Sequence, residues 1–186
     1  MNTLGKLLAL FIISITTQAQ NIIGPQPGYS PEVGTLVSML NDLSDRVDYT
    51  VKDLDTEQLD FLMDDQANRI GSLIMHLAAT EAFYQVYTFE HREFNKAEKK
   101  QWEDAMNLGD KARKEYQGHD VSYYLDIFKT VRQKTLDLMK EKDDEWLASI
   151  PEGYNMNNYW AWFHVMEHQS SHLGQILLIK KRLPKQ

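Results

Sequence analysis

The sequence predicts an all-α fold, a four-helix bundle with a long connection between the second and third helices. Four segments carry apolar side chains at intervals of three and four, which is the repeat of one helix face. Strict alternation of apolar and polar residues, the mark of a half-buried strand, nowhere runs far enough to predict a sheet. With 186 residues, 42% of them hydrophobic and 25% charged, the chain fits one globular domain with its own core.

The first residues predict a secretory signal peptide. Lys6 precedes an uncharged run from Leu7 to Ile15, and Thr17-Gln18-Ala19 offers the small residues at alternate positions that signal peptidase requires. The apolar run is shorter than the roughly 20 residues that a membrane-spanning helix needs. We therefore expect a signal peptide over residues 1–19, a mature domain over residues 20–186, and export to the periplasm or the medium.

The charge and the cysteine count exclude several classes of function. The formal net charge is −7, and loss of Lys6 with the signal peptide takes it to −8. An acidic chain without a basic cluster is not expected to bind nucleic acid or an anionic membrane surface. The chain has no cysteine, which rules out a disulfide framework, a thiolate metal site and a cysteine nucleophile.

The first bundle helix is expected to begin at Ser30-Pro31, where a capping serine precedes proline at the first helical position. Its apolar stripe continues to Val51. A polar link, residues 53–65, leads to a second helix from about Asn68 to Phe89. This helix carries His76 near the edge of its apolar stripe, where a lone histidine, taken by itself, is more often a core residue than a ligand.

Residues 90–118 mix acidic and basic side chains and predict a long solvated connection with some short helix. His91 and His119, at its two ends, are expected to be exposed. A third helix should cover residues 120–142, where an aspartate near the start is followed by an apolar stripe. Proline, glycine and asparagine then break the chain between residues 151 and 158.

The fourth helix is expected from about Asn158 to Arg182, with basic residues in its last turn where they complement the helix dipole. In it, His164, His168 and His172 recur at intervals of four. Because residues four apart lie one turn apart on the same face, His168 and His172 can aim their imidazoles at one point. Imidazole binds zinc, nickel, copper or iron, and two histidines leave such an ion one or two ligands short.

A second pattern overlaps the first. The string His164-Val165-Met166-Glu167-His168 matches the H-x-x-E-H signature of a class of zinc proteases. That interpretation would place the ion on His164 and His168 and make Glu167 the general base. The proteases that carry this string are usually built on larger α/β domains, which argues against it in a small helical chain.

Two segments resemble the motifs of the DinB-like four-helix metal-binding proteins. The stretch NRIGSLIMHLAATE, residues 68–81, resembles the family's second-helix element, in which a histidine follows an asparagine-containing helix start. The stretch HQSSHLGQI, residues 168–176, resembles its last-helix H-x-x-x-H followed by Gly-Gln. The helix order matches over nearly the whole mature chain. The resemblance therefore implies a four-helix bundle.

The resemblance also implies that His76, His168 and His172 bind one divalent transition metal ion, with open positions for water or substrate. Many relatives have a second histidine just before the final ligand and an arginine just after it, where this chain has Ser171 and Leu173. This departure leaves zinc, nickel, iron and manganese undistinguished.

Some DinB-like proteins resemble thiol-dependent transferases, in which the ion lowers the pKa of a small thiol. We therefore expect an exported metal-binding protein that acts as a transferase or hydrolase on a small molecule, with Glu167 as the candidate catalytic residue. The alternative is a non-catalytic or stress-associated module, in which the ion serves folding or sequestration. The resemblance also favours a homodimer, and the aromatic residues Trp160, Trp162 and Phe163 are expected to be core or pocket wall.

Overall fold

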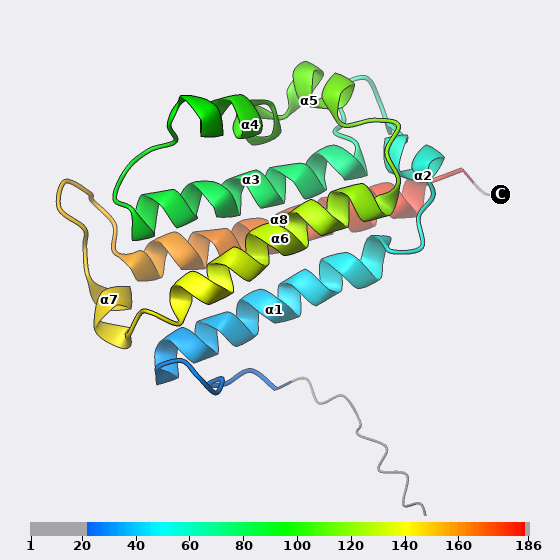
Figure 1. Ribbon diagram of the computed structural model, residues 1–186. Coiled ribbons are helices and arrows are strands. Elements are labelled where there is room, and N and C mark those ends of the chain that lie inside the picture. Colours follow the sequence, from blue (N-terminus) through cyan, green and yellow to red (C-terminus); the bar gives the residue numbers. More distant parts are fainter. Residues whose placement is uncertain (1–21, 185–186) are drawn as a thin grey trace, which may run out of the picture.

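The computed structural model describes residues 22–184, which form helices and connecting segments without a strand in that range (Figure 1). The four long helices are α1 (Pro31–Val51), α3 (Ile70–Phe89), α6 (Val121–Met139) and α8 (Asn158–Arg182). The short helices are α2 (Thr56–Asp60), α4 (Lys96–Asn107), α5 (Gly109–Glu115) and α7 (Asp144–Ala148). The predicted all-α bundle is confirmed. The predicted signal peptide, residues 1–19, lies outside the described residues.

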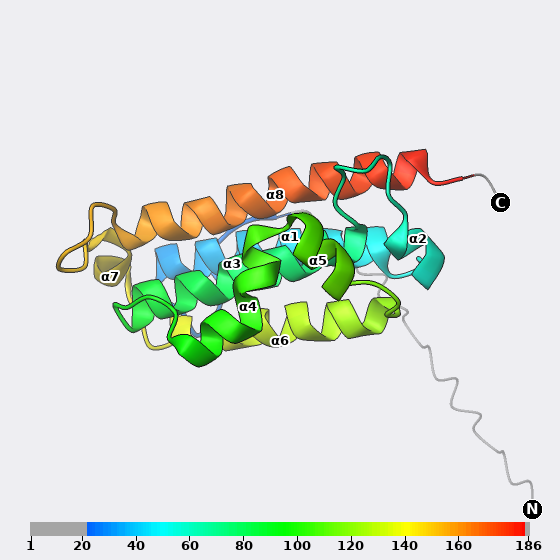
Figure 2. The same ribbon diagram turned by 90° about the horizontal axis from the view of Figure 1, so that it is seen from above.

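The topology explains the long connection after α3. Helices α1 and α8 run in one direction, and α3 and α6 run in the other (Figure 1). Because α3 and α6 are parallel neighbours, the chain must return along the length of α3, about 30 Å for a helix of 20 residues, before α6 can begin. Helices α4 and α5 make this return and lie along α3 (Figures 1 and 2).

The return segment is more deeply packed than its composition predicts. Trp102 and Ala105 of α4, and Ala112 of α5, are buried in the same core cluster as α3. The charged residues of α4 occupy its outer face, so the expected solvated surface is correct for that side only. His91 is exposed as expected, whereas His119 is half-buried because its ring stacks on Tyr123 at 3.9 Å between centroids.

Helix α1 starts where the sequence predicts, but its cap comes from a distant part of the chain. The Asp144 carboxylate of α7 accepts hydrogen bonds from the Ser30 hydroxyl at 2.5 Å and from the backbone N–H groups of Glu32 and Val33 at 2.9 and 3.2 Å. The Ser30 hydroxyl is thus a donor to Asp144 rather than the cap itself. These bonds, led by the one from Ser30, hold the pKa of Asp144 below its usual value.

The interface between α3 and α6 is close. A Cβ atom added at Gly71 of α3 would overlap the ring of Tyr124 on α6, so a side chain there would push the two helices apart. The ring of Tyr124 is itself fully buried.

Within residues 22–184, no helix combines the length and the apolar character that crossing a membrane requires.

A buried ion pair connects the four long helices. The guanidinium of Arg132 on α6 donates to both carboxylate oxygens of Glu81 on α3 at 2.8 Å, and the two side chains are 5% and 1% exposed. The same guanidinium donates to the Gln169 side chain of α8 at 2.9 Å and to the backbone carbonyl of Leu40 on α1. The Thr135 hydroxyl donates to Glu81 at 2.6 Å. The charges are therefore paired and also hydrogen-bonded.

Replacing Arg132 by leucine is expected to destabilise the fold by about 3–5 kcal/mol, because the Glu81 carboxylate would stay buried without a counter-charge. The double variant Glu81→Leu/Arg132→Leu should recover part of this loss, since it leaves no unpaired charge. Urea unfolding followed by circular dichroism measures both effects. If the single variant lost less than about 1 kcal/mol of unfolding free energy, the proposed contribution of this ion pair to stability would be contradicted.

Candidate metal centre

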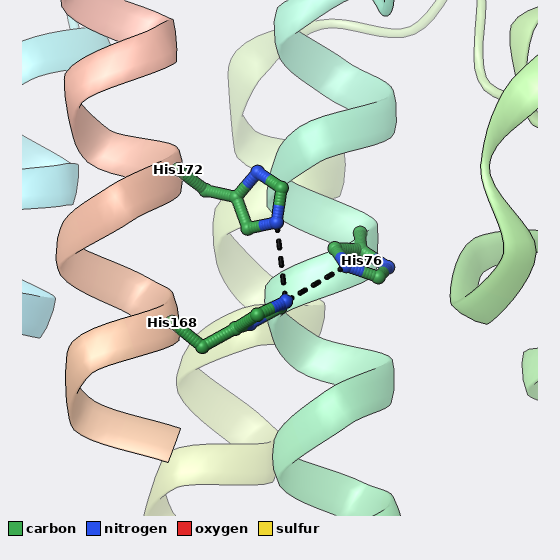
Figure 3. A group of neighbouring side chains, drawn as sticks. All are labelled: His76, His168 and His172. Carbon is green, nitrogen blue, oxygen red and sulfur yellow. Dashed lines mark hydrogen bonds between the residues drawn. The ribbon is translucent and has the colours of Figure 1, made fainter. Parts of the chain in front are cut away.

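Three histidines from two helices meet on the side of the bundle that α4 covers. Figure 3 shows His76 of α3 facing His168 and His172 of α8. The Nε2 atom of His168 lies 3.1 Å from the Nε2 atoms of both His76 and His172. Each side chain offers one ring nitrogen to a group whose atoms all lie within 4.8 Å of one another. The structure thus brings together the three histidines that the resemblance singles out, and we call them the histidine triad.

Helical spacing explains how the triad forms. His168 and His172 are four residues apart in α8, so their side chains project from the same face one turn apart. His76 lies on the part of antiparallel α3 that packs against this face, and it is 8% exposed.

The outer ring nitrogens of two of these histidines have partners of their own. The Nδ1 atom of His76 lies 2.8 Å from the backbone carbonyl of Ala105 in α4. A carbonyl oxygen only accepts, so Nδ1 of His76 must carry the proton. In the same way, Nδ1 of His172 lies 3.1 Å from the Oε1 atom of Gln175 and donates to it. Both histidines therefore turn a proton-free Nε2 atom toward His168.

This arrangement leaves an excess of lone pairs at the centre of the triad. A neutral His168 can carry at most one proton on Nε2, and that proton can be directed at His76 or at His172 but not fully at both. The Nε2 atom of His168 thus lies 3.1 Å from each of the other two Nε2 atoms. There are too few protons for a hydrogen bond at both contacts. A cation bound between the three nitrogens would satisfy all three lone pairs, so the residues present fit a metal ion.

Burial keeps the triad in the neutral form that binds metals. Desolvation lowers the pKa of His168 to about 3, and the neighbouring His172, His76 and His164 rings add to the effect. Desolvation is also the main cause of the lowered pKa values of His76 and His172. At neutral pH the three rings are therefore uncharged, so no proton has to be removed before Nε2 can act as a ligand.

His164 and Glu167 form a pair beside the triad. The Nδ1 atom of His164 lies 2.8 Å from the Glu167 carboxylate, and the two side chains are 32% and 43% exposed. The ring of His164 lies 5.5 Å from that of His168, between centroids. In the part of the chain that the structure describes, the histidine cluster with metal-binding geometry contains His76 and not His164. The three-residue cluster is thus made of the histidines that the DinB-like motifs imply, and His164 lies outside it.

Of the aromatic residues expected as core or pocket wall, Trp162 is in the core and Phe163 lines a pocket with Met39 and Tyr159. Trp162 is fully buried, whereas Trp160 and Phe163 are 46% and 52% exposed. Sequence reasoning missed the Ala105 carbonyl because a backbone acceptor leaves no trace in residue identity. Gln175 could be found from its position three residues after His172, which places it within reach on the same helix face.

The tautomers of the triad are open to direct measurement. In metal-free protein at pH 7.5, long-range ¹H–¹⁵N NMR spectra should show the Nδ1–H tautomer for His76 and His172, because desolvation lowers the pKa of both rings and keeps them neutral there. Replacing Gln175 by leucine removes the acceptor of His172 alone, so His172 should lose its tautomer preference while His76 keeps it. A matched change in both residues would contradict the assigned contacts.

Comparison with known proteins gives one family. A family model described as mycothiol-S-transferase matches residues 35–183, which run from the first turns of α1 to the end of α8 and include the whole triad. No curated protein sequence matches the chain.

Proposed function

Because the chain belongs to the mycothiol-S-transferase family, a DinB-like family of metal-dependent proteins, we propose that it is a metal-dependent S-transferase whose ion is held by His76, His168 and His172. The observation that carries this proposal is the convergence of three Nε2 atoms with too few protons to bond them. Three protein ligands leave coordination positions for a substrate, as in catalytic rather than closed structural sites.

The proposed substrates are a low-molecular-weight thiol, of which mycothiol gives the family its name, and a small electrophile. When bound, a divalent ion lowers the pKa of a thiol so that the thiolate is available at neutral pH. The thiolate sulfur forms a bond to the electrophilic carbon as the bond from that carbon to its leaving group breaks. The leaving group departs with the electron pair of the broken bond, and the thiol proton must go to a base.

We propose that His164 is the base that accepts the thiol proton. Its Nδ1–H donates to Glu167, so its other nitrogen has a free lone pair on a ring that lies next to His168. In this scheme Glu167 orients His164 by accepting its Nδ1–H, instead of acting as the base itself. The sequence suggested Glu167 as the catalytic residue, and we now propose that it positions His164.

The experiment combines metal analysis with thiol transfer. Plasma mass spectrometry of the tag-free protein should find about one equivalent of a divalent transition metal in the wild type and in His164→Ala, but little in His76→Ala or His168→Ala. With mycothiol and iodoacetamide as substrates, the metal-loaded wild type should transfer the thiol. His164→Ala should be slower by about 10²-fold or more, because it lacks the proton acceptor.

Each outcome separates the possible functions. Full metal content in His76→Ala would overturn the triad as the ligand set. Stoichiometric metal without thiol transfer would overturn the transferase assignment and favour a non-catalytic metal-binding module. Unchanged rates in His164→Ala would remove that residue from the mechanism while leaving the ion site intact.

We also propose that the protein is exported, on the strength of the apolar run and the small residues before Ala19. Reduced low-molecular-weight thiols are scarcer outside the cytosol, so export would restrict where the transfer could run. Expression of the full chain, fractionation and N-terminal sequencing should find Gln20 as the first residue of an extracytoplasmic product. An intact N-terminus in the cytosolic fraction would contradict export.

A further inference from the structure

A row of aromatic rings leads away from the histidine triad toward the start of α8. Its rings are linked in sequence, with centroid separations of 5.2 Å from Trp160 to His164, 5.7 Å from His164 to Tyr84, 6.1 Å from Tyr84 to Tyr87 and 4.2 Å from Tyr87 to Tyr154. His164 in turn lies 5.5 Å from His168. We call the five residues Tyr84, Tyr87, Tyr154, Trp160 and His164 the aromatic shelf.

Tyr84 is buried, but the other four rings of the aromatic shelf keep some exposure to water. Trp160 is 46% exposed, and its ring lies parallel to that of His164 with an interplanar angle of 9°. Tyr87 and Tyr154 are half-buried. By contrast, Trp162 on the core side of α8 is fully buried. Aromatic faces that remain accessible beside convergent polar groups are typical of small-molecule sites.

The charged groups beside the aromatic shelf are carboxylates. Glu167 bonds His164 and lies near Tyr84, and Glu93 lies near Tyr87. Both tyrosines have raised pKa values, caused first by desolvation and then by neighbouring tyrosines and these carboxylates. Among residues 22–184, the lysines that sit over aromatic rings contact Tyr49, Phe89 and Trp146, outside the aromatic shelf. The local field therefore disfavours an anion.

We propose that the aromatic shelf binds the electrophilic substrate, and that this substrate is a planar aromatic molecule without negative charge. The proposal rests on the proposed thiol transfer for its chemistry, since a ring held beside the exposed part of His164 would bring an electrophilic carbon toward the triad. Offset stacking on the exposed face of Trp160 and contact with the half-buried ring of Tyr87 would supply the binding. A chloride or similar group on the ring would then leave as the carbon–sulfur bond forms.

Binding is tested without turnover, so that failure of the aromatic shelf and failure of the transferase function can be told apart. Metal-loaded protein is titrated calorimetrically with 1,3-dinitrobenzene, an unreactive neutral ring, and with 3,5-dinitrobenzenesulfonate, the same ring with a negative charge. We expect saturable binding of the neutral probe and at least about 10-fold weaker binding of the sulfonate.

Variants of α8 locate the site. Trp160→Ala should weaken binding of the neutral probe by at least about 5-fold, and Trp160→Phe should restore most of it because a ring remains. The matched control is Phe163→Ala, an equally exposed ring of α8 that lines a different pocket with Met39 and Tyr159, and it should bind as the wild type does.

Equal binding in Trp160→Ala and wild type, or tighter binding of the sulfonate, would overturn the proposal. Parallel assays follow thiol transfer to 1-chloro-2,4-dinitrobenzene and to iodoacetamide. Selective binding without any transfer would uphold the aromatic shelf and reject the transferase function. Transfer to iodoacetamide without binding of the neutral ring would uphold the function and reject the aromatic shelf.

Discussion

The buried pair of Arg132 and Glu81 fixes the relative positions of the helices on which the site depends. Glu81 lies five residues after His76 in α3, and Gln169 directly follows His168 in α8. The Arg132 guanidinium binds both Glu81 and Gln169, so it holds one turn of α3 level with one turn of α8. A slip of either helix would break charge-assisted bonds in the core and would also separate the ring nitrogens of the triad. The polar interior thus sets a register that apolar packing alone defines poorly.

Helix α4 has two roles in this arrangement. Its buried Trp102 and Ala105 close the core over α3, and the carbonyl of Ala105 accepts the proton of His76 Nδ1. The backbone that completes the bundle therefore also selects the tautomer in which Nε2 of His76 is free. His172 reaches the same state through Gln175, an exposed side chain of its own helix. His76 is thus oriented by a backbone carbonyl of a packed helix, whereas His172 is oriented by an exposed side chain.

Much of the fold follows from local signals in the sequence. Proline at the first position of α1, the three- and four-residue apolar spacing and the basic last turn of α8 predicted those helices to within a few residues. The i, i+4 spacing predicted that His168 and His172 would converge. His76 needed the family resemblance, because partners in contact across 92 residues share no local pattern. The packing of α4 was missed because its few apolar residues, such as Trp102 and Ala105, are spaced among many charges.

The cap of α1 has a consequence for the order of events during synthesis. Its acceptor, Asp144, is made 114 residues after Ser30, so at roughly 5–20 residues per second the helix waits about 6 to 23 seconds for it. During that time the first-turn amides of α1 can be satisfied only by water or by the Ser30 hydroxyl. A contact of such long sequence separation raises the contact order of a helical protein, whose folding is otherwise dominated by nearby pairs. The observed cap of α1 can therefore form only after α7 has been synthesised.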